Sequence, residues 1–254
     1  MVEATGEDSL ANILLEIVAS TVDDCLAAES GGADRIELCA AISEGGLTPS
    51  LGTLVEAKKR VRIPMMAMVR PRGGGFCYSE AEFAVMQRDA ALLLEYGADG
   101  IVFGMLHSDG SVDTKRCGKL VELAGERQTV FHRAFDVVPD PKLALDELID
   151  LGFTRVLTSG QQPTALEGSD LIRKVVDCAR GRIAVLPGSG IRAHNVWQLI
   201  EATGCTQVHM TAFAANSDAS TDSSHLHFGS HEKTDAELVR RVKETLNAIG
   251  QAAK

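Results

Sequence analysis

The chain has 254 residues, of which 45% are hydrophobic and 24% charged, and its formal net charge at pH 7 is −10. This length and composition are typical of one large soluble α/β domain or two small ones, and the acidic balance argues against nucleic acid or an anionic membrane as a partner. No apolar run approaches the roughly 20 residues of a membrane span, and the first residues are acidic, unlike a secretory signal. The six cysteines include no CxxC pair, which indicates reduced thiols in a cytoplasmic protein.

Eight short apolar runs predict eight β-strands. They lie at residues 14–20, 36–38, 64–70, 101–103, 129–135, 156–158, 183–187 and 208–210. A glycine-led segment ends the preceding helical pattern and opens every second strand, beginning at Gly32, Gly97, Gly152 and Gly204. Strands that alternate with helices form a parallel sheet, so we expect these four segments at the starts of even-numbered strands that point the same way.

Helix-start signals support the same count. Capping boxes open two helices, at residues 79–82 (SEAE) and 234–237 (TDAE). Asp140 followed by Pro141 opens another, with a capping side chain and then a proline at the first helical position.

Eight βα units in about 250 residues predict a single-domain (β/α)8 TIM barrel over residues 1–254. The barrel core should span about residues 13–212, followed by a C-terminal loop and a last helix at 213–254. Within that tail, residues 214–224 are rich in Ser, Asp and Thr and are predicted to form a long loop. A doubly wound open sheet is the alternative, but the chain lacks its GxGxxG fingerprint.

Polar residues within the strands predict a charged barrel interior. Arg35, Glu37 and Cys39 share one face of the second strand, opposite an aliphatic face. Helices cover the outside of a barrel, so the polar face should point inward. The same alternation adds further residues near the C-terminal ends of the strands, where barrel enzymes place their chemistry: Glu16, Arg70, His132 and Ser159. Two acids, two arginines and an imidazole that converge favour a functional pocket over a structural ion-pair network.

Five longer motifs together resemble the copper homeostasis protein CutC family. They are GGADRIELC at 31–39, SEGGLTPS at 43–50, RPRGGGFCYS at 70–79, FHRAFD at 131–136 and LTSG at 157–160. The resemblance extends from about residue 14 to residue 211, and it implies a cytoplasmic TIM barrel that handles Cu(I).

Soft sulfur ligands suit Cu(I), which makes the cysteines the first candidates for its ligands. Cys39, at the end of the second strand, is the strongest candidate ligand, and Cys77 in the glycine-rich loop or Met68 could be another. The strand-one position in the same layer as Cys39 is Val18, so that position offers no second thiol. Packing of the cysteines as small hydrophobic residues is the alternative. Three histidines in the polar tail form a further candidate metal cluster, for which a solvated loop is the simpler interpretation: His225, His227 and His231.

An enzyme is the competing interpretation. The turn Gly188-Ser189-Gly190 follows the seventh strand, where barrels often bind phosphate through main-chain N–H groups. Combined with Glu16, Glu37 and His132 as catalytic candidates, it suggests an isomerase, epimerase or lyase that acts on a small anionic metabolite, such as a phosphorylated one, by acid–base catalysis. No strand carries a lysine in its C-terminal half, which disfavours a Schiff-base aldolase.

The expected partner is therefore a copper ion or a small anionic ligand, and a homo-oligomer is compatible with the sequence. The residues predicted to bind the ligand are Glu16, Arg35, Glu37, Arg70, Arg72, His132, Arg133, Ser159, Gly188, Ser189 and Gly190. The arginines would clamp the anion through charge-assisted hydrogen bonds.

Overall fold

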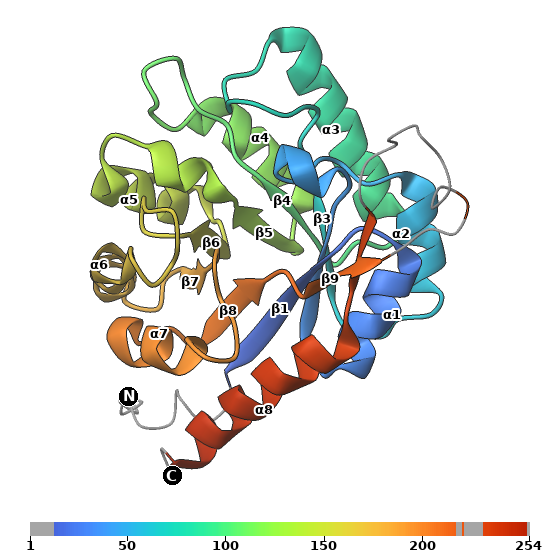
Figure 1. The fold of residues 1–254 in the computed structure, drawn as a ribbon. Helices are drawn as coiled ribbons and strands as arrows, with labels where there is room; N and C mark the ends of the chain where they lie inside the picture. The colour runs from blue at the N-terminus through green and yellow to red at the C-terminus, as the bar shows by residue number, and fades with distance from the viewer. Residues whose placement is uncertain (1–12, 217–219, 221–230, 253–254) are drawn as a thin grey trace.

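A computed structural model describes residues 13–216, 220 and 231–252 of the chain. Eight parallel strands stand in the sheet order β7-β6-β5-β4-β3-β2-β1-β8, and a parallel bridge between Gly188 and His209 joins the two ends of this order. Helices surround the strands (Figure 1). The predicted TIM barrel is confirmed. No helix among the described residues is long and apolar enough to cross a bilayer.

The strands and helices alternate along the chain. The barrel strands are β1 (Leu14–Ala19), β2 (Arg35–Leu38), β3 (Met65–Met68), β4 (Gly100–Phe103), β5 (Gln128–Phe131), β6 (Arg155–Thr158), β7 (Ala184–Pro187) and β8 (Gln207–Met210). The helices are α1 (Val22–Ser30), α2 (Leu51–Lys58), α3 (Glu80–Glu95), α4 (Thr114–Ala124), α5 (Pro141–Leu151), α6 (Ser169–Ala179), α7 (Val196–Thr203) and α8 (Ala236–Ala252). The four glycine-led segments precede β2, β4, β6 and β8, as predicted.

Side-chain capping fixes where several helices begin. The capping box of Ser79 and Glu82 opens α3, and the Asp140 carboxylate accepts hydrogen bonds from the N–H groups of Lys142 and Leu143 at the start of α5. The predicted start of the last helix is displaced by one residue. Asp235, not Thr234, accepts from the first N–H groups of α8, because Thr234 is engaged as the last residue of a strand.

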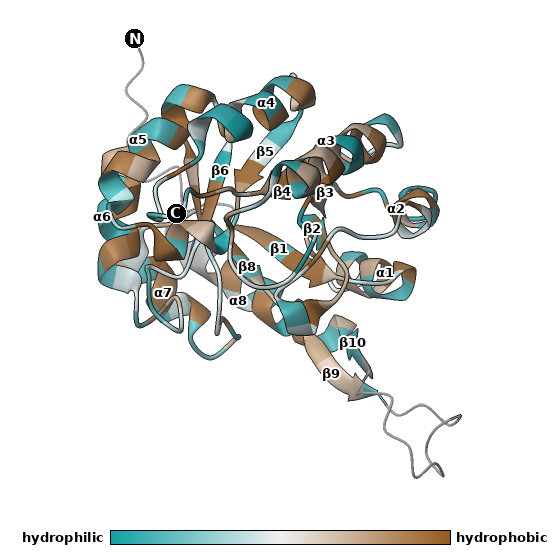
Figure 2. Ribbon diagram, turned by 90° about the horizontal axis from the view of Figure 1, so that it is seen from above, coloured by the Kyte–Doolittle hydropathy of each residue, from teal (hydrophilic) through white to brown (hydrophobic). Residues whose placement is uncertain are grey.

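Two predicted segments differ from the structure. The fifth strand ends at Phe131, where the His132 side chain accepts from the Ala134 N–H and starts a 3-10 turn, Arg133–Val137. The predicted loop at 214–224 begins instead as strand β9 (Phe213–Asn216), which pairs antiparallel with β10 (His231–Thr234) and extends from the barrel (Figure 2). Pairing of its main-chain groups with β10 holds this segment extended. Residues 217–219 and 221–224 lie outside the described residues.

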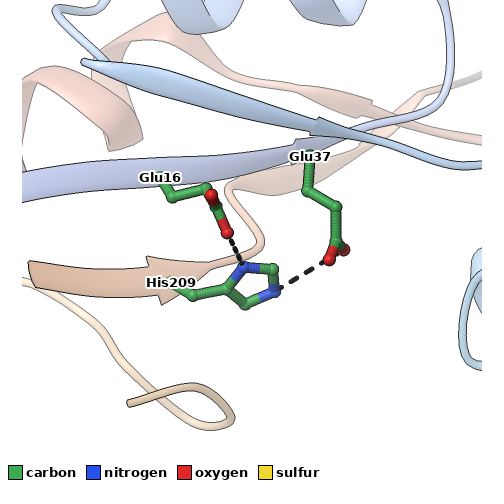
Figure 3. A group of neighbouring side chains, drawn as sticks. All are labelled: Glu16, Glu37 and His209. Atoms are coloured by element: carbon green, nitrogen blue, oxygen red, sulfur yellow. Dashed lines mark hydrogen bonds and ion pairs between the residues drawn. The ribbon is translucent and has the colours of Figure 1, made fainter. Parts of the chain in front are cut away.

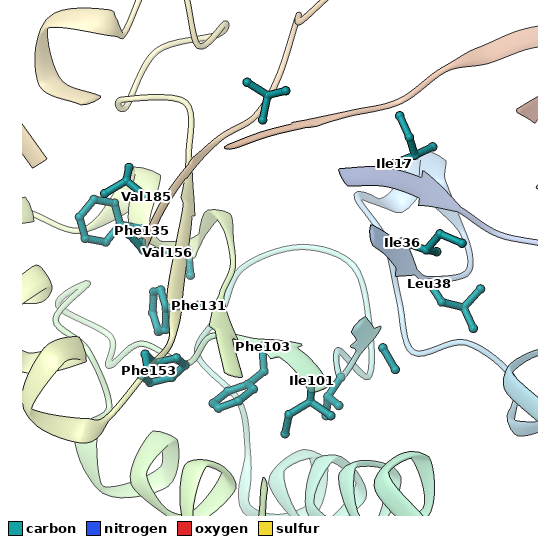
Figure 4. Close-up of a cluster of buried hydrophobic side chains, with 14 of the residues drawn as sticks. Ile17, Ile36, Leu38, Ile101, Phe103, Phe131, Phe135, Phe153, Val156 and Val185 are labelled. Carbon is teal, nitrogen blue, oxygen red and sulfur yellow. The ribbon is translucent and has the colours of Figure 1, made fainter. Parts of the chain in front are cut away.

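The strands are buried on both faces. Their outer face packs against the helices through large aliphatic and aromatic residues such as Ile36, Phe103 and Phe131 (Figure 4). Their inner face forms a second apolar cluster inside the barrel, made of Val18, Cys39, Met66, Met68, Val102, Val130, Leu157 and Leu186. The alternation of faces therefore holds around the ring.

A buried polar network fills the N-terminal end of the barrel. Gln207 Oε1 accepts hydrogen bonds from Arg35 Nη2 at 2.8 Å and from Arg155 Nε at 2.9 Å, and Arg155 Nη2 donates to Gln128 Oε1 at 2.9 Å. These four residues are the first of β2, β8, β6 and β5. Arg35 also forms an ion pair with Glu16, and both side chains are at most 3% exposed. We call this network, at the N-terminal end of the barrel interior, the floor of the barrel.

Gly100 provides a test of how tightly the interior is packed. A Cβ atom at this position would lie 2.3 Å from the Gln128 carbonyl oxygen and 2.8 Å from Met66 Sδ. We expect Gly100→Ala to lower the free energy of unfolding by about 1–3 kcal/mol, measured by urea denaturation, because the backbone of β5 must shift. Gly75→Ala is the control, since nothing lies within 4 Å of its Cβ position. Equal stability of the two variants would contradict this packing.

The Arg35–Glu16 ion pair should be essential for stability. Arg35→Met leaves a carboxylate buried without its cation, which costs about 3–5 kcal/mol of unfolding free energy. The matched control is Arg173→Met in the exposed i,i+4 pair with Asp177 on α6, where the loss should stay below about 1 kcal/mol. Chemical denaturation of both variants measures the difference, and similar losses would show that Glu16 does not need Arg35.

Candidate functional site

A cavity of about 520 Å³ opens at the C-terminal end of the barrel. Its walls are apolar in part, with Val18, Met68, Phe76 and Leu157 among them. Its polar lining comes from strand ends and the loops after them: Glu37, Arg70, His132, Arg133, Asp136, Ser189, Gly190, Arg192 and His209. A concave site with an apolar wall and a few convergent polar groups is the usual form of a small-molecule site.

Three buried side chains meet at the base of this cavity: Glu37 on β2 and His209 on β8 line it, and Glu16 on β1 contacts His209 without lining it (Figure 3). The strands are adjacent, and β1 pairs Glu16 with His209 on one side and Val18 with Glu37 on the other. His209 Nδ1 lies 2.7 Å from Glu16 Oε1, and His209 Nε2 lies 3.9 Å from Glu37 Oε2. The imidazole thus stands between two carboxyl groups.

The protonation of this cluster follows from its surroundings. Burial opposes the ionisation of Glu16, but the Arg35 guanidinium and His209 hold the pKa of Glu16 well below its usual range. An ionised carboxylate can only accept, so His209 Nδ1 carries a proton and Nε2 is the nitrogen that faces Glu37. Burial also disfavours a charge on His209, yet Glu37 and Glu16 together raise its pKa.

Glu37 combines a raised pKa with a place in the lining of the cavity. Burial raises its pKa to about 7, against the lowering effect of His209 and with a further increase from the Glu16 charge. Its Oε1 atom is buried and has no hydrogen-bond partner among the described residues. A carboxyl group that titrates near neutrality and lines a cavity is suited to accept and return a proton.

His132 differs from the role predicted for it. Its Nδ1 accepts from the Ala134 N–H at 3.2 Å, so the ring proton sits on Nε2, which is buried and has no hydrogen-bond partner in the described part of the chain. Burial and the neighbouring Arg70 lower the pKa of His132 to about 3. His132 is therefore a neutral hydrogen-bond donor to the cavity and not a base.

Arg70 lines the cavity and forms no ion pair with an acid among the described residues. Its guanidinium donates to the carbonyl oxygens of Glu44, Gly46 and Gly74 at 2.7, 3.0 and 2.8 Å. These carbonyls belong to the loops after β2 and β3. Arg70 thus joins two loops of the rim and keeps its positive charge available to a ligand.

Several predicted residues lie elsewhere. Arg35 is the first residue of β2 and sits in the floor with Glu16, not at the C-terminal end, so neither lines the cavity. Arg72 turns away to pair with Glu82 at the start of α3. Gly188 lies behind the wall, where a Cβ would meet Leu157 at 2.7 Å and His209 at 3.2 Å.

Ser159 is a supporting residue instead of a lining one. Its hydroxyl accepts from Arg133 Nη2 at 2.6 Å and contacts Asp136, whose carboxylate also accepts from Arg133 Nε at 2.7 Å. The same carboxylate accepts from the Gln161 N–H in the loop after β6. Asp136 thereby ties the loop after β5 to the loop after β6 and orients Arg133 at the cavity.

The two cysteines predicted as Cu(I) ligands, Cys39 and Cys77, lie in different surroundings. Cys39 is buried, lines the cavity and packs with Met68, and both side chains lie against Gly46. Burial, with the Glu37 charge, raises the pKa of the Cys39 thiol well above its usual range. Cys77 is exposed and does not line the cavity, so among the described residues Cys39 is the cysteine that the cavity offers. For Cu(I) the donors are therefore one thiol and one thioether, a sparse set of the correct softness. The predicted histidine cluster, His225 and His227 with the side chain of His231, lies outside the described part of the chain.

The sequence reasoning missed His209, Asp136 and Arg192. His209 alternates with Gln207 in β8 as Glu37 does with Arg35 in β2, and that alternation was the available signal. Asp136 and Arg192 belong to loops, where no strand alternation gives a direction.

Comparisons with known proteins agree with this fold. The family model for the CutC family matches residues 13–214. A protein named as a family protein CutC from Treponema denticola is 55% identical over 210 residues, which cover 83% of this chain and 85% of that protein. The copper homeostasis protein cutC homolog of Homo sapiens is 48% identical, with 82% of this chain and 77% of that protein covered.

Solved structures give the same result. The structure of a copper homeostasis protein CutC from Streptococcus agalactiae superposes with a TM-score of 0.75 at 35% identity and covers 78% of this chain and 98% of its own. A phosphoribosyl anthranilate isomerase from Thermotoga maritima superposes with a TM-score of 0.58 at 11% identity, covering 93% of this chain and 99% of its own, which shows a shared barrel fold alone. The chain belongs to the CutC family.

Proposed function

We propose that the protein catalyses proton transfer on a small anionic metabolite, as an isomerase, epimerase or lyase. The observation that carries this proposal is Glu37, a buried carboxyl group at the bottom of a cavity, with a pKa of about 7 and one oxygen that has no hydrogen-bond partner among the described residues. A base works best when its pKa is close to the working pH, because both protonation states are then accessible.

The neighbours of Glu37 supply the remaining roles. In this proposal the Glu37 carboxylate removes a proton from a carbon next to a carbonyl group. Glu16 fixes the orientation of His209 through Nδ1, and Nε2 of His209 faces Glu37. In this proposal His209 and Glu37 share the proton that the cluster accepts. The neutral His132 donates from Nε2–H to the oxygen on which negative charge develops.

The anionic part of the metabolite would lie at the rim. Arg133 and Arg192 line the cavity there, with Arg70 beside them, and charge-assisted hydrogen bonds from arginine suit carboxylate and phosphate oxygens. Ser189 adopts a left-handed φ of 85°, and its hydroxyl donates to the Pro163 carbonyl oxygen at 2.7 Å. A non-glycine residue held in this strained conformation at a cavity supports a functional role for the turn after β7. We place this activity in the cytoplasm, in keeping with six free thiols.

Deuterium exchange tests the proposal directly. Sugar phosphates and 2-oxo or 2-hydroxy acids are incubated with the protein in D2O, and exchange at the carbon next to the carbonyl or hydroxyl group is followed by NMR. We expect exchange with at least one class, rising with pH as Glu37 loses its proton around pH 7, and a loss of roughly 10²-fold or more in Glu37→Gln. Glu56→Gln, on the exposed face of α2, should retain the wild-type rate. Exchange that persists in Glu37→Gln, or no exchange across the panel, would contradict the proposal.

Binding of Cu(I) is the second candidate function. It is supported by the adjacent sulfur side chains of Cys39 and Met68 and by relatives that are named copper homeostasis proteins. Against it stands the raised pKa of the Cys39 thiol, because the thiolate is the ligand form.

A competition assay under anaerobic conditions measures this affinity. If Cys39 is a ligand, Cys39→Ser should weaken Cu(I) binding by at least about tenfold, roughly 1.4 kcal/mol. Cys178→Ser, in α6 and away from the cavity, is the control and should bind as the wild type does. Equal affinity of wild type and Cys39→Ser would remove Cys39 from the copper site.

A further inference from the structure

The cluster at the bottom of the cavity has the features of a cation site. His209 Nε2 and Glu37 Oε2 are 3.9 Å apart, which is too far for a hydrogen bond. Zinc binds nitrogen and carboxylate oxygen at about 2.0–2.2 Å, so two ligands of one tetrahedral ion stand about 3.4 Å apart. The observed gap therefore needs to narrow by only about half an ångström to hold an ion between the two side chains.

We propose that His209 Nε2 and the Glu37 carboxylate bind a divalent cation of the zinc type, with Glu16 as the residue that orients His209. This inference does not depend on the proposed reaction and gives Glu37 a different role, because a carboxylate that binds a cation does not act as the base.

Glu16 is the hydrogen-bond acceptor that a metal-binding histidine usually has for its second ring nitrogen. Its Oε1 accepts from His209 Nδ1–H at 2.7 Å, which fixes the ring orientation and leaves the Nε2 lone pair directed at Glu37. A carboxylate behind the imidazole makes the ring a better ligand. Arg35 in turn holds the other oxygen of Glu16, so Glu16 itself is not free to bind the ion.

The unpartnered oxygen of Glu37 is independent evidence for a ligand here. Glu37 is 4% exposed, and its Oε1 has no hydrogen-bond partner among the described residues. A buried acceptor of this kind is costly to leave unsatisfied. A cation bound to the carboxylate would satisfy it.

The net charge of the cluster also favours a cation. Glu16 and Arg35 neutralise each other, so with a neutral His209 the cluster carries the single negative charge of Glu37. A divalent ion changes this to a single positive charge that faces the cavity. The remaining coordination positions would be open to water or to an anion in the cavity, since both protein ligands line it.

The donor types select among metals. One imidazole and carboxylate oxygen suit zinc or its neighbours among the first-row divalent metals, whereas Cu(I) prefers sulfur and Mg²⁺ prefers oxygen alone. The proposed site is therefore chemically distinct from the Cys39–Met68 pair.

Co²⁺ is the probe, because its absorption spectrum reports nitrogen and oxygen coordination. The full-length protein, washed with chelator, is titrated with Co²⁺ and then with Zn²⁺ as a competitor, and calorimetry gives the stoichiometry. We expect one ion per chain and a weakening of at least about 100-fold in His209→Gln and in Glu37→Gln. Glu16→Gln should weaken binding by about 10–100-fold while both ligands remain.

His132→Gln is the matched control for metal affinity, because His132 is also a buried imidazole of the cavity but has no carboxylate partner. It should bind Co²⁺ as the wild type does, and so should Cys39→Ser. Circular dichroism confirms that each variant is folded, and an upward shift of the wild-type Tm with Zn²⁺ is an independent readout. No binding by folded wild type, or binding that survives in both His209→Gln and Glu37→Gln, would overturn the proposal.

Discussion

The ion pair between Arg35 and Glu16 is the interaction on which the interior depends. It lies inside the barrel, away from solvent, and the guanidinium, together with His209, holds the pKa of Glu16 low enough for this carboxyl group to stay ionised. An ionised Glu16 fixes the proton of His209 on Nδ1, and this sets which nitrogen faces the cavity. Glu37 is then the carboxyl without a close cation, and burial brings its pKa to about 7. The pKa of the carboxyl group that lines the cavity therefore depends in part on charges at the floor of the barrel.

Alternation along the strands predicted the fold and the inward faces, because a side-chain period of two is a local property. It did not predict how far along the barrel axis each inward residue lies. Arg35 and Glu37 share a face, yet Arg35 begins β2 and Glu37 stands two residues higher, which separates floor from cavity. That height depends on the stagger between strands, which is a tertiary property. Loop residues were the least predictable. Arg70 and Arg72 flank one proline, and one joins the rim while the other pairs with α3.

Hard and soft donors occupy different levels of the barrel interior. Glu37 lies in β2 and Cys39 directly follows the end of this strand, and both line the cavity. The carboxyl lies beside an imidazole, whereas the thiol lies beside methionine in the apolar cluster. Burial and the Glu37 charge keep the thiol protonated. The family name refers to copper, but this one cavity holds two chemically different sets of donor atoms, which have to be distinguished.

The carboxylate of Asp136 has a consequence for how this barrel can diversify. The rim loops of a TIM barrel usually vary independently, and this is why the fold supports so many activities. Here one side chain is bonded at the same time to Arg133 in its own loop and to the Ser159 and Gln161 N–H groups in the next. An insertion in either loop would break the bonds of both. Variation on this side of the barrel must therefore be concerted, and a loop exchanged with another barrel would have to be transplanted together with its neighbour.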